Sequence, residues 1–97
     1  MALKTTRFDS AEYLASDEAV SAYLEEALET GDPAFIAQAL GTVARARGMS
    51  QIAKEAGLSR ESLYKALSPE GNPEFSTIIR VMRALGLRLC VAAMERG

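Results

Sequence analysis

Apolar residues recur at helical spacing along most of the chain, which predicts a protein built from short helices. Ser10 opens a predicted turn of helix that reaches Leu14. The first longer helix is expected between Ser16, a suitable N-cap residue, and Gly31, a suitable C-terminal stop. Its apolar face should consist of Ala19, Val20, Tyr23, Leu24, Ala27 and Leu28.

A second helix is predicted directly after the first. Asp32 caps helices well and Pro33 suits a first helical position, so this helix should begin here. We expect it to reach Arg47 and to end at Gly48. The residues expected to face inward are Phe35, Ile36, Ala39, Leu40 and Val43.

Two short helices are predicted next, over residues 50–56 and 60–67. Gly57 should end the first of them, and Ser59 should cap the second. The following residues, 68–73, are rich in Ser, Pro, Gly and Asn, which is typical of a loop.

A last helix is predicted over residues 74–85, with Gly86 as its stop. Its apolar residues are Phe75, Ile78, Ile79, Met82 and Leu85. The tail, residues 87–92, alternates partly between apolar and polar positions and is rich in branched residues. This pattern favours a short strand over a last turn of helix. Cys90 is expected to be a small buried hydrophobe.

The predicted fold class is therefore all-α: a five-helix DNA-binding domain with an N-terminal helical extension and a short C-terminal strand or tail. Residues 1–31 form the acidic extension, and residues 32–97 form the helical domain with its tail, as one compact unit. The chain has 97 residues, of which 48% are hydrophobic, so its core is small. Domains of this size often gain stability by dimerising.

Composition argues against several classes of function. The chain has no histidine and a single cysteine, so a disulfide within the chain, a zinc site or a histidine-based catalytic triad lacks its components. We therefore expect no enzyme activity, no metal and no cofactor. No apolar run approaches the roughly 20 residues that a membrane span requires, and no apolar segment follows the basic N-terminus. We therefore expect a cytoplasmic protein without a membrane partner.

The net charge of −2 conceals an uneven distribution of charge. Residues 1–44 contain two basic and eight acidic residues, whereas residues 45–97 contain nine basic and five acidic residues. A polyanion would be attracted to the second half and repelled by the first. The alternative is an acidic, solvated helix beside an ordinary mixed surface.

Residues 49–68 have the layout of a helix-turn-helix, which is two short helices joined by a tight turn. Ala53 is small where the two helices would cross, and Gly57 lies where the turn requires a positive φ. The residues expected in the buried seam are Ile52, Ala56, Leu58, Leu63 and Ala66. Similar helix pairs also occur in bundles that bind no nucleic acid. The predicted helices on either side of this pair favour the DNA-binding interpretation.

The polar face of the second short helix would lie in the major groove of double-stranded DNA. Arg60 could contact guanine O6 and N7 or a phosphate, Glu61 could accept from cytosine N4, and Tyr64 could contact a thymine methyl group. Lysines would attract the phosphate backbone, and amide side chains would bind phosphate oxygens. The predicted DNA-binding residues are Gln51, Lys54, Ser59, Arg60, Glu61, Tyr64, Lys65, Ser68 and Asn72.

Residues 35–91 resemble the lambda-repressor/Xre-type helix-turn-helix domain and, more narrowly, the HigA-type addiction-module antidote proteins. The resemblance is carried by GMSQIA at 48–53, GLSRESLYKAL at 57–67, GNPEFST at 71–77 and VMRALGLRL at 81–89. The opening FDSAEYL at 8–14 is also similar to the start of that family, so the resemblance covers nearly the whole chain.

The resemblance implies an antitoxin of a type II toxin-antitoxin module. Such a protein neutralises a small, basic RelE/ParE-like toxin, binds operator DNA as a homodimer and represses its own operon. The acidic helix within residues 17–29 is a hypothetical toxin-binding surface, since opposite charge speeds association. It could equally be a packing helix with a solvated face. Two other functions stay open: a solitary prophage-type transcriptional regulator, and a protein-binding inhibitor that does not bind DNA.

Overall fold

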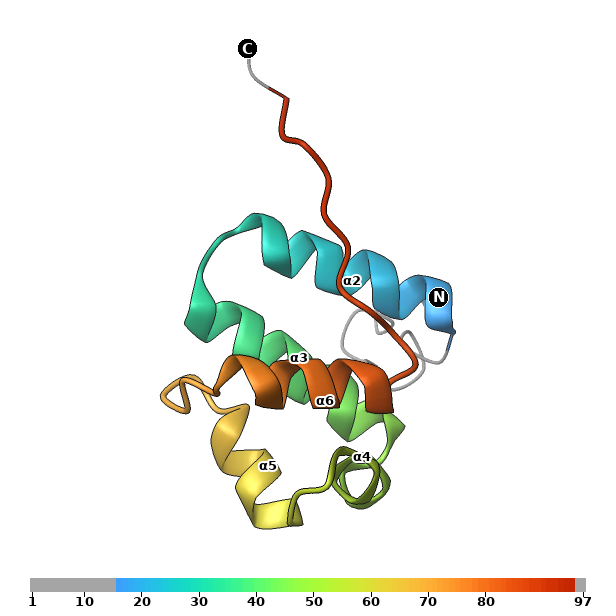
Figure 1. The fold of residues 1–97 in the computed structure, drawn as a ribbon, viewed down its shortest axis with the longest axis vertical. Coiled ribbons are helices and arrows are strands. Elements are labelled where there is room, and N and C mark those ends of the chain that lie inside the picture. The colour runs from blue at the N-terminus through green and yellow to red at the C-terminus, as the bar shows by residue number, and fades with distance from the viewer. Residues whose placement is uncertain (1–15, 96–97) are drawn as a thin grey trace, which may run out of the picture.

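The computed structural model describes residues 16–95, and the predicted turn at 10–14 lies outside them. The described residues form helices and connecting segments without a strand, in agreement with the all-α prediction. The helices, labelled as in Figure 1, are α2 (Asp17–Glu29), α3 (Pro33–Arg47), α4 (Met49–Ala56), α5 (Arg60–Ala66) and α6 (Phe75–Ala84). The predicted boundaries therefore agree with the structure to within one residue at each helix end.

The three predicted polar caps begin the helices to which they were assigned. The Ser16 hydroxyl accepts a hydrogen bond from the Ala19 amide at 3.1 Å, and Asp32 Oδ1 accepts one from the Ala34 amide at 3.1 Å. The Ser59 hydroxyl accepts one from the Ser62 amide at 3.0 Å. Each bond satisfies an amide that the helix itself leaves without a partner, so the caps fix where these helices start.

The core contains side chains from all five described helices. Its largest fully buried members are Val20 of α2, Leu40 and Val43 of α3, Leu63 of α5 and Val81 of α6. From α4, the buried members of the same cluster are Met49, Ile52, Ala53 and Ala56. Helix α2 packs on α3, and α4 packs on α3, α5 and α6. One continuous core therefore joins α2 to α4 and α5.

Three aromatic or aliphatic residues expected on apolar helix faces are exposed instead. Leu28 is 44%, Phe35 45% and Phe75 71% exposed. Leu28 lies in the last turn of α2, whereas Phe35 and Phe75 lie in the first turns of α3 and α6. The expectation of burial is therefore wrong for these three residues, each of which lies in a terminal turn of its helix.

Of the two alternatives predicted for the C-terminal segment, a strand or a tail, the described residues of the single chain form the tail. Residues 87–95 are described and contain no strand, because no other segment of the described chain lies alongside to complete a ladder. The tail leaves the end of α6, crosses α2 and then extends away from the helices (Figure 1). Leu87 and Leu89 are half-buried against the core, whereas Arg88 and Cys90 are exposed. The expectation of a buried Cys90 is therefore also wrong, because Cys90 lies on the outward side of this alternation.

Gly71 lies directly beneath the C-terminal end of α5, within the loop before α6. A Cβ at this position would overlap the carbonyl oxygens of Lys65 and Ala66 and would lie 2.7 Å from the Ala66 carbonyl carbon. All three atoms belong to the backbone and cannot rotate away. The loop therefore requires glycine here for close packing against the end of α5.

Gly71→Ala should lower the free energy of unfolding by about 3 kcal/mol, because the added methyl group must displace backbone. Gly31→Ala is a matched control: Gly31 has a φ of 68°, but a Cβ there would meet nothing within 4 Å beyond its chain neighbours. Backbone strain alone should cost the control about 1 kcal/mol. Urea denaturation of the purified variants measures both values, and equal stability of Gly71→Ala and the wild-type chain would contradict this account.

Candidate nucleic-acid interface

Helices α4 and α5 are joined by a tight turn whose geometry depends on Gly57. This residue has φ 76° and ψ 30°, in the left-handed region that glycine adopts without a Cβ clash. The amide of Gly57 donates to the Lys54 carbonyl at 3.2 Å, and the amide of Leu58 donates to the Ala53 carbonyl at 2.8 Å. These bonds close the end of α4 and direct the chain into Ser59, where α5 begins.

Packing beneath the turn determines which face of α5 points outward. Ile52, Ala53 and Ala56 of α4 are buried, as is Leu63 of α5, and Leu58 and Ala66 are half-buried. The five residues assigned to the seam from the sequence therefore contribute to it, as does the small Ala53 at the crossing of the helices. Burial of this seam leaves the opposite side of α5 in solvent.

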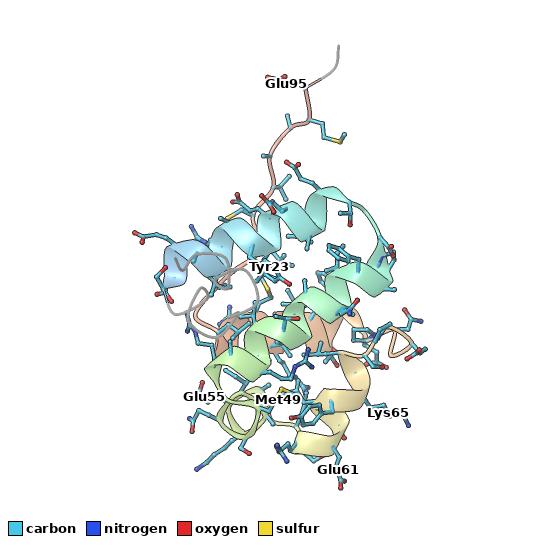
Figure 2. All side chains as sticks on the ribbon, turned by 180° about the vertical axis from the view of Figure 1, so that it is seen from behind. Tyr23, Met49, Glu55, Glu61, Lys65 and Glu95 are labelled. Carbon is cyan, nitrogen blue, oxygen red and sulfur yellow. The ribbon has the colours of Figure 1, made fainter. Side chains whose placement is uncertain are left out.

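Eight of the nine residues predicted to bind DNA are exposed, and Ser68 is half-buried. Glu61 and Lys65 project from α5 away from the body of the protein (Figure 2). The exposed members are Gln51, Lys54, Ser59, Arg60, Glu61, Tyr64, Lys65 and Asn72. Helices α4 and α5 supply all of these except Ser59, which caps α5, and Asn72, which lies in the loop before α6. The polar residues selected from the sequence are thus accessible to a partner, with Ser68 less so than the rest.

Arg60 and Tyr64 form a pair on the exposed face of α5. Arg60 Nη2 donates to the Tyr64 hydroxyl at 3.3 Å, and the Arg60 Cζ atom lies 5.1 Å from the centroid of the tyrosine ring. The ring therefore restricts the guanidinium through both a hydrogen bond and a cation–π contact. The sequence pattern identified both residues but not their pairing, although residues four apart on a helix are neighbours.

Two other predicted residues have hydrogen bonds that change how they could contact DNA. Gln51 Nε2 donates to Glu55 Oε2 at 2.7 Å, so the amide is held by a carboxylate that the sequence pattern did not single out. The Ser68 hydroxyl donates to the carbonyl of Lys65 at 2.9 Å, which satisfies an acceptor at the end of α5. Ser68 therefore stabilises the end of the helix and is directed less toward solvent than its neighbours.

The acidic residues of the extension lie at the far end of the molecule from α5. Helix α2 and helix α5 are separated by α3 and α6 in both views (Figures 1 and 2). The exposed acids of α2 are Asp17, Glu18, Glu25, Glu26 and Glu29. Asp17 Oδ1 lies 2.8 Å from Arg47 Nη2, in an ion pair that ties the start of α2 to the end of α3. The acidic residues of α2 are thus remote from the polar face of α5.

Helices α4 and α5 are thus joined by a tight turn over a buried seam, with a polar helix face directed outward. Comparison with known proteins then identifies the family. Residues 4–93 match the model of a family described as probable addiction module antidote protein. The chain therefore belongs to this family, and an antidote implies a toxin that it counteracts.

The chain is also similar to a curated relative over most of its length. An uncharacterized protein of Haemophilus influenzae is 55% identical over 84 residues, which cover 87% of each chain. No solved structure matches the chain. Among the helices of residues 16–95, none has the length and apolar character needed to cross a membrane.

Ser59→Ala should lower the free energy of unfolding by about 1 kcal/mol, because the Ser62 amide at the start of α5 loses its acceptor. Ser62→Ala is the matched control. It removes the Oγ–Oγ hydrogen bond of 2.9 Å but keeps the capping bond from the residue 62 amide, so its loss of stability should be smaller. Thermal and urea unfolding of both variants measure the difference; equal losses would show that the cap does not stabilise α5.

Proposed function

We propose that this chain is a HigA-type antitoxin with a lambda-repressor-like helix-turn-helix. In this proposal it binds operator DNA as a homodimer, represses its own operon in the cytoplasm and neutralises a small, basic RelE/ParE-like toxin. Its role is binding rather than catalysis. The observation that carries the proposal is the exposed polar face of α5, which stands on a buried seam with α4.

The DNA-binding part of the proposal depends on the chemistry of the α5 face. A guanidinium held beside a tyrosine ring loses less freedom when it binds, and its planar donors match guanine O6 and N7. We assign this contact to Arg60. Glu61 accepts from cytosine N4, Tyr64 contacts a thymine methyl group, and Lys54 and Lys65 lie against phosphates.

The remaining predicted contacts are positioning contacts. Gln51 lies at the start of α4, and its amide nitrogen has two hydrogens to donate. It reaches a phosphate either with the hydrogen that Glu55 does not accept or after its hydrogen bond to Glu55 breaks. Ser59, Ser68 and Asn72 lie at the ends of α5 and before α6, where they would follow the DNA backbone. These contacts would orient the protein without selecting a base sequence.

The double variant Arg60→Ala/Lys65→Ala should weaken binding to the upstream region of the operon about 100-fold or more, because it removes a base contact and a phosphate contact. The slope of affinity against salt should also fall by about one unit for each lost phosphate contact. Fluorescence anisotropy with labelled upstream DNA measures both quantities.

The matched control is Arg45→Ala/Arg80→Ala, which removes the same charge from exposed positions on α3 and α6. The affinity of this control for the upstream DNA should fall only by the small amount that the loss of two positive charges causes through weaker long-range attraction. If the two double variants bind equally well, the assignment of α5 as the recognition helix is wrong. If the wild-type chain binds no upstream DNA but still neutralises the toxin, the protein is an inhibitor without DNA binding.

The toxin-binding part of the proposal uses the opposite end of the molecule. Helix α2 exposes Glu25, Glu26 and Glu29, and the apolar Leu28 among them is 44% exposed. An exposed apolar side chain surrounded by charge is typical of a protein interface with a polar rim. A basic toxin would be steered to this end of the chain, away from the DNA-binding end.

The variant Glu25→Gln/Glu29→Gln should slow association with the toxin about tenfold at low salt and leave operator binding unchanged, because the lost charges lie only on α2. Stopped-flow association with the product of the adjacent gene measures the rate, and growth rescue on co-expression measures neutralisation. Glu70→Gln/Glu74→Gln is the control with equal charge change, since both residues are exposed in the loop before α6. Absence of any growth rescue by the wild-type chain would instead favour a solitary regulator.

A further inference from the structure

In the tail, residues 87–95, apolar residues recur at every second position from 87 to 93, and this alternation continues past the residues that the helices cover. Leu87 and Leu89 are half-buried against the core, yet Val91, the next residue of the same parity, is 99% exposed. From 89 to 94 the sequence LCVAAM contains no charged residue. A soluble chain seldom leaves such a segment in water without a partner.

Beyond Leu87, the backbone of the tail makes no hydrogen bond to another backbone group of the described residues. The Leu87 amide donates to the Met82 carbonyl at 2.8 Å, but within residues 16–95 no backbone hydrogen bond involves residues 88–95. The segment is rich in residues that favour strands, and its composition led to a strand prediction. An extended segment with free amides and carbonyls is a template for another strand.

A shallow hollow lies beside the covered part of the tail. It has a volume of about 210 Å³ and is lined by Ile79, Met82, Arg83, Leu87, Arg88 and Leu89. Most of these side chains are apolar. A strand added along the tail would place its own apolar side chains over this hollow, next to Leu87 and Leu89.

We propose that the occupant is the tail of a second copy of this chain, paired antiparallel about a twofold axis at Cys90. This inference deepens the proposed homodimer and rests on it. The pairing sets Leu89 opposite Val91 of the partner subunit, and Leu87 opposite Ala93 of the partner subunit. Both pairs lie on the apolar face, so each Val91 is covered by the Leu89 and the hollow of the other copy.

Pairing length, charge and sequence favour this register among the symmetric ones. An axis at Leu89 would pair only residues 87–91, whereas an axis at Cys90 pairs residues 87–93. An axis at Arg88 would place the two arginines directly opposite each other, which is destabilising. An axis at Val91 would set Leu87 opposite Glu95 of the partner subunit, a carboxylate on the apolar face. With the axis at Cys90, the two Arg88 side chains are offset by four residues, about 13 Å along the ribbon.

The first test measures oligomeric state by light scattering and sedimentation of the full chain without DNA. The wild-type chain should be a dimer, and Val91→Lys should raise the dimer dissociation constant about tenfold or more, because it places a charge opposite Leu89. Met94→Lys is the matched control: Met94 is 85% exposed and lies beyond the paired residues 87–93, so it should leave the dimer unchanged. Since Val91 is fully exposed in the single chain, its replacement should not unfold the helices.

The second test locates the axis by cross-linking with copper phenanthroline as the added oxidant. The two Cys90 thiols should form an intermolecular disulfide, because residues at the axis lie directly opposite each other. The double variant Cys90→Ala/Ala92→Cys should not cross-link, since its thiols would be about 13 Å apart along the ribbon. Equal cross-linking of the two proteins overturns the register.

A wild-type chain that is monomeric at about 100 μM, or equal effects of Val91→Lys and Met94→Lys, overturns the tail pairing. Anisotropy with operator DNA separates this inference from the proposed function. A chain that dimerises through the tail but binds no DNA supports the pairing and contradicts the operator-binding role. A dimer that is insensitive to Val91→Lys yet binds operator DNA contradicts only the pairing.

Discussion

Helix α5 has seven residues, too few for a stable helix in water, so its conformation depends on the burial of Leu63 and Leu67. Burial of a leucine side chain contributes about 1.5–3 kcal/mol, which exceeds what the Ser59 cap can supply. The same packing sets the rotation of the helix. Every polar residue proposed to contact DNA from α5 takes its direction from these two buried leucines.

The core that holds α5 also extends to the opposite end of the molecule. Val20 and Leu24 of α2 belong to the same buried cluster as Leu63. Helix α2 is thus packed into the same core as α4 and α5 rather than attached by a free linker. A partner bound on α2 and a nucleic acid bound on α5 would therefore occupy separate surfaces of one body, without competing for the same side chains.

The tail is the part of the described chain whose conformation the helices determine least. Leu87 and Leu89 attach it to the core, and beyond them its side chains and backbone are exposed to water. A strand is a property of two segments, because its hydrogen bonds run between them. For that reason a sequence pattern can favour a strand even where the single chain cannot form one.

The amino-acid sequence by itself determined the helices, their caps and the inner and outer faces of the helix-turn-helix. These features depend on local rules: the spacing of apolar residues, the acceptors of Ser16, Asp32 and Ser59, and the positive φ of Gly57. The polar residues of the candidate site could also be predicted from the sequence. Those of them on α4 and α5 are residues that do not belong to the buried seam. Only the tertiary structure decided that Phe35 and Phe75 are exposed, that Arg60 is held by Tyr64, and that Gly71 touches the end of α5. Each of these facts depends on the positions of neighbouring helices and side chains in three dimensions. The order of residues along the chain does not specify those positions.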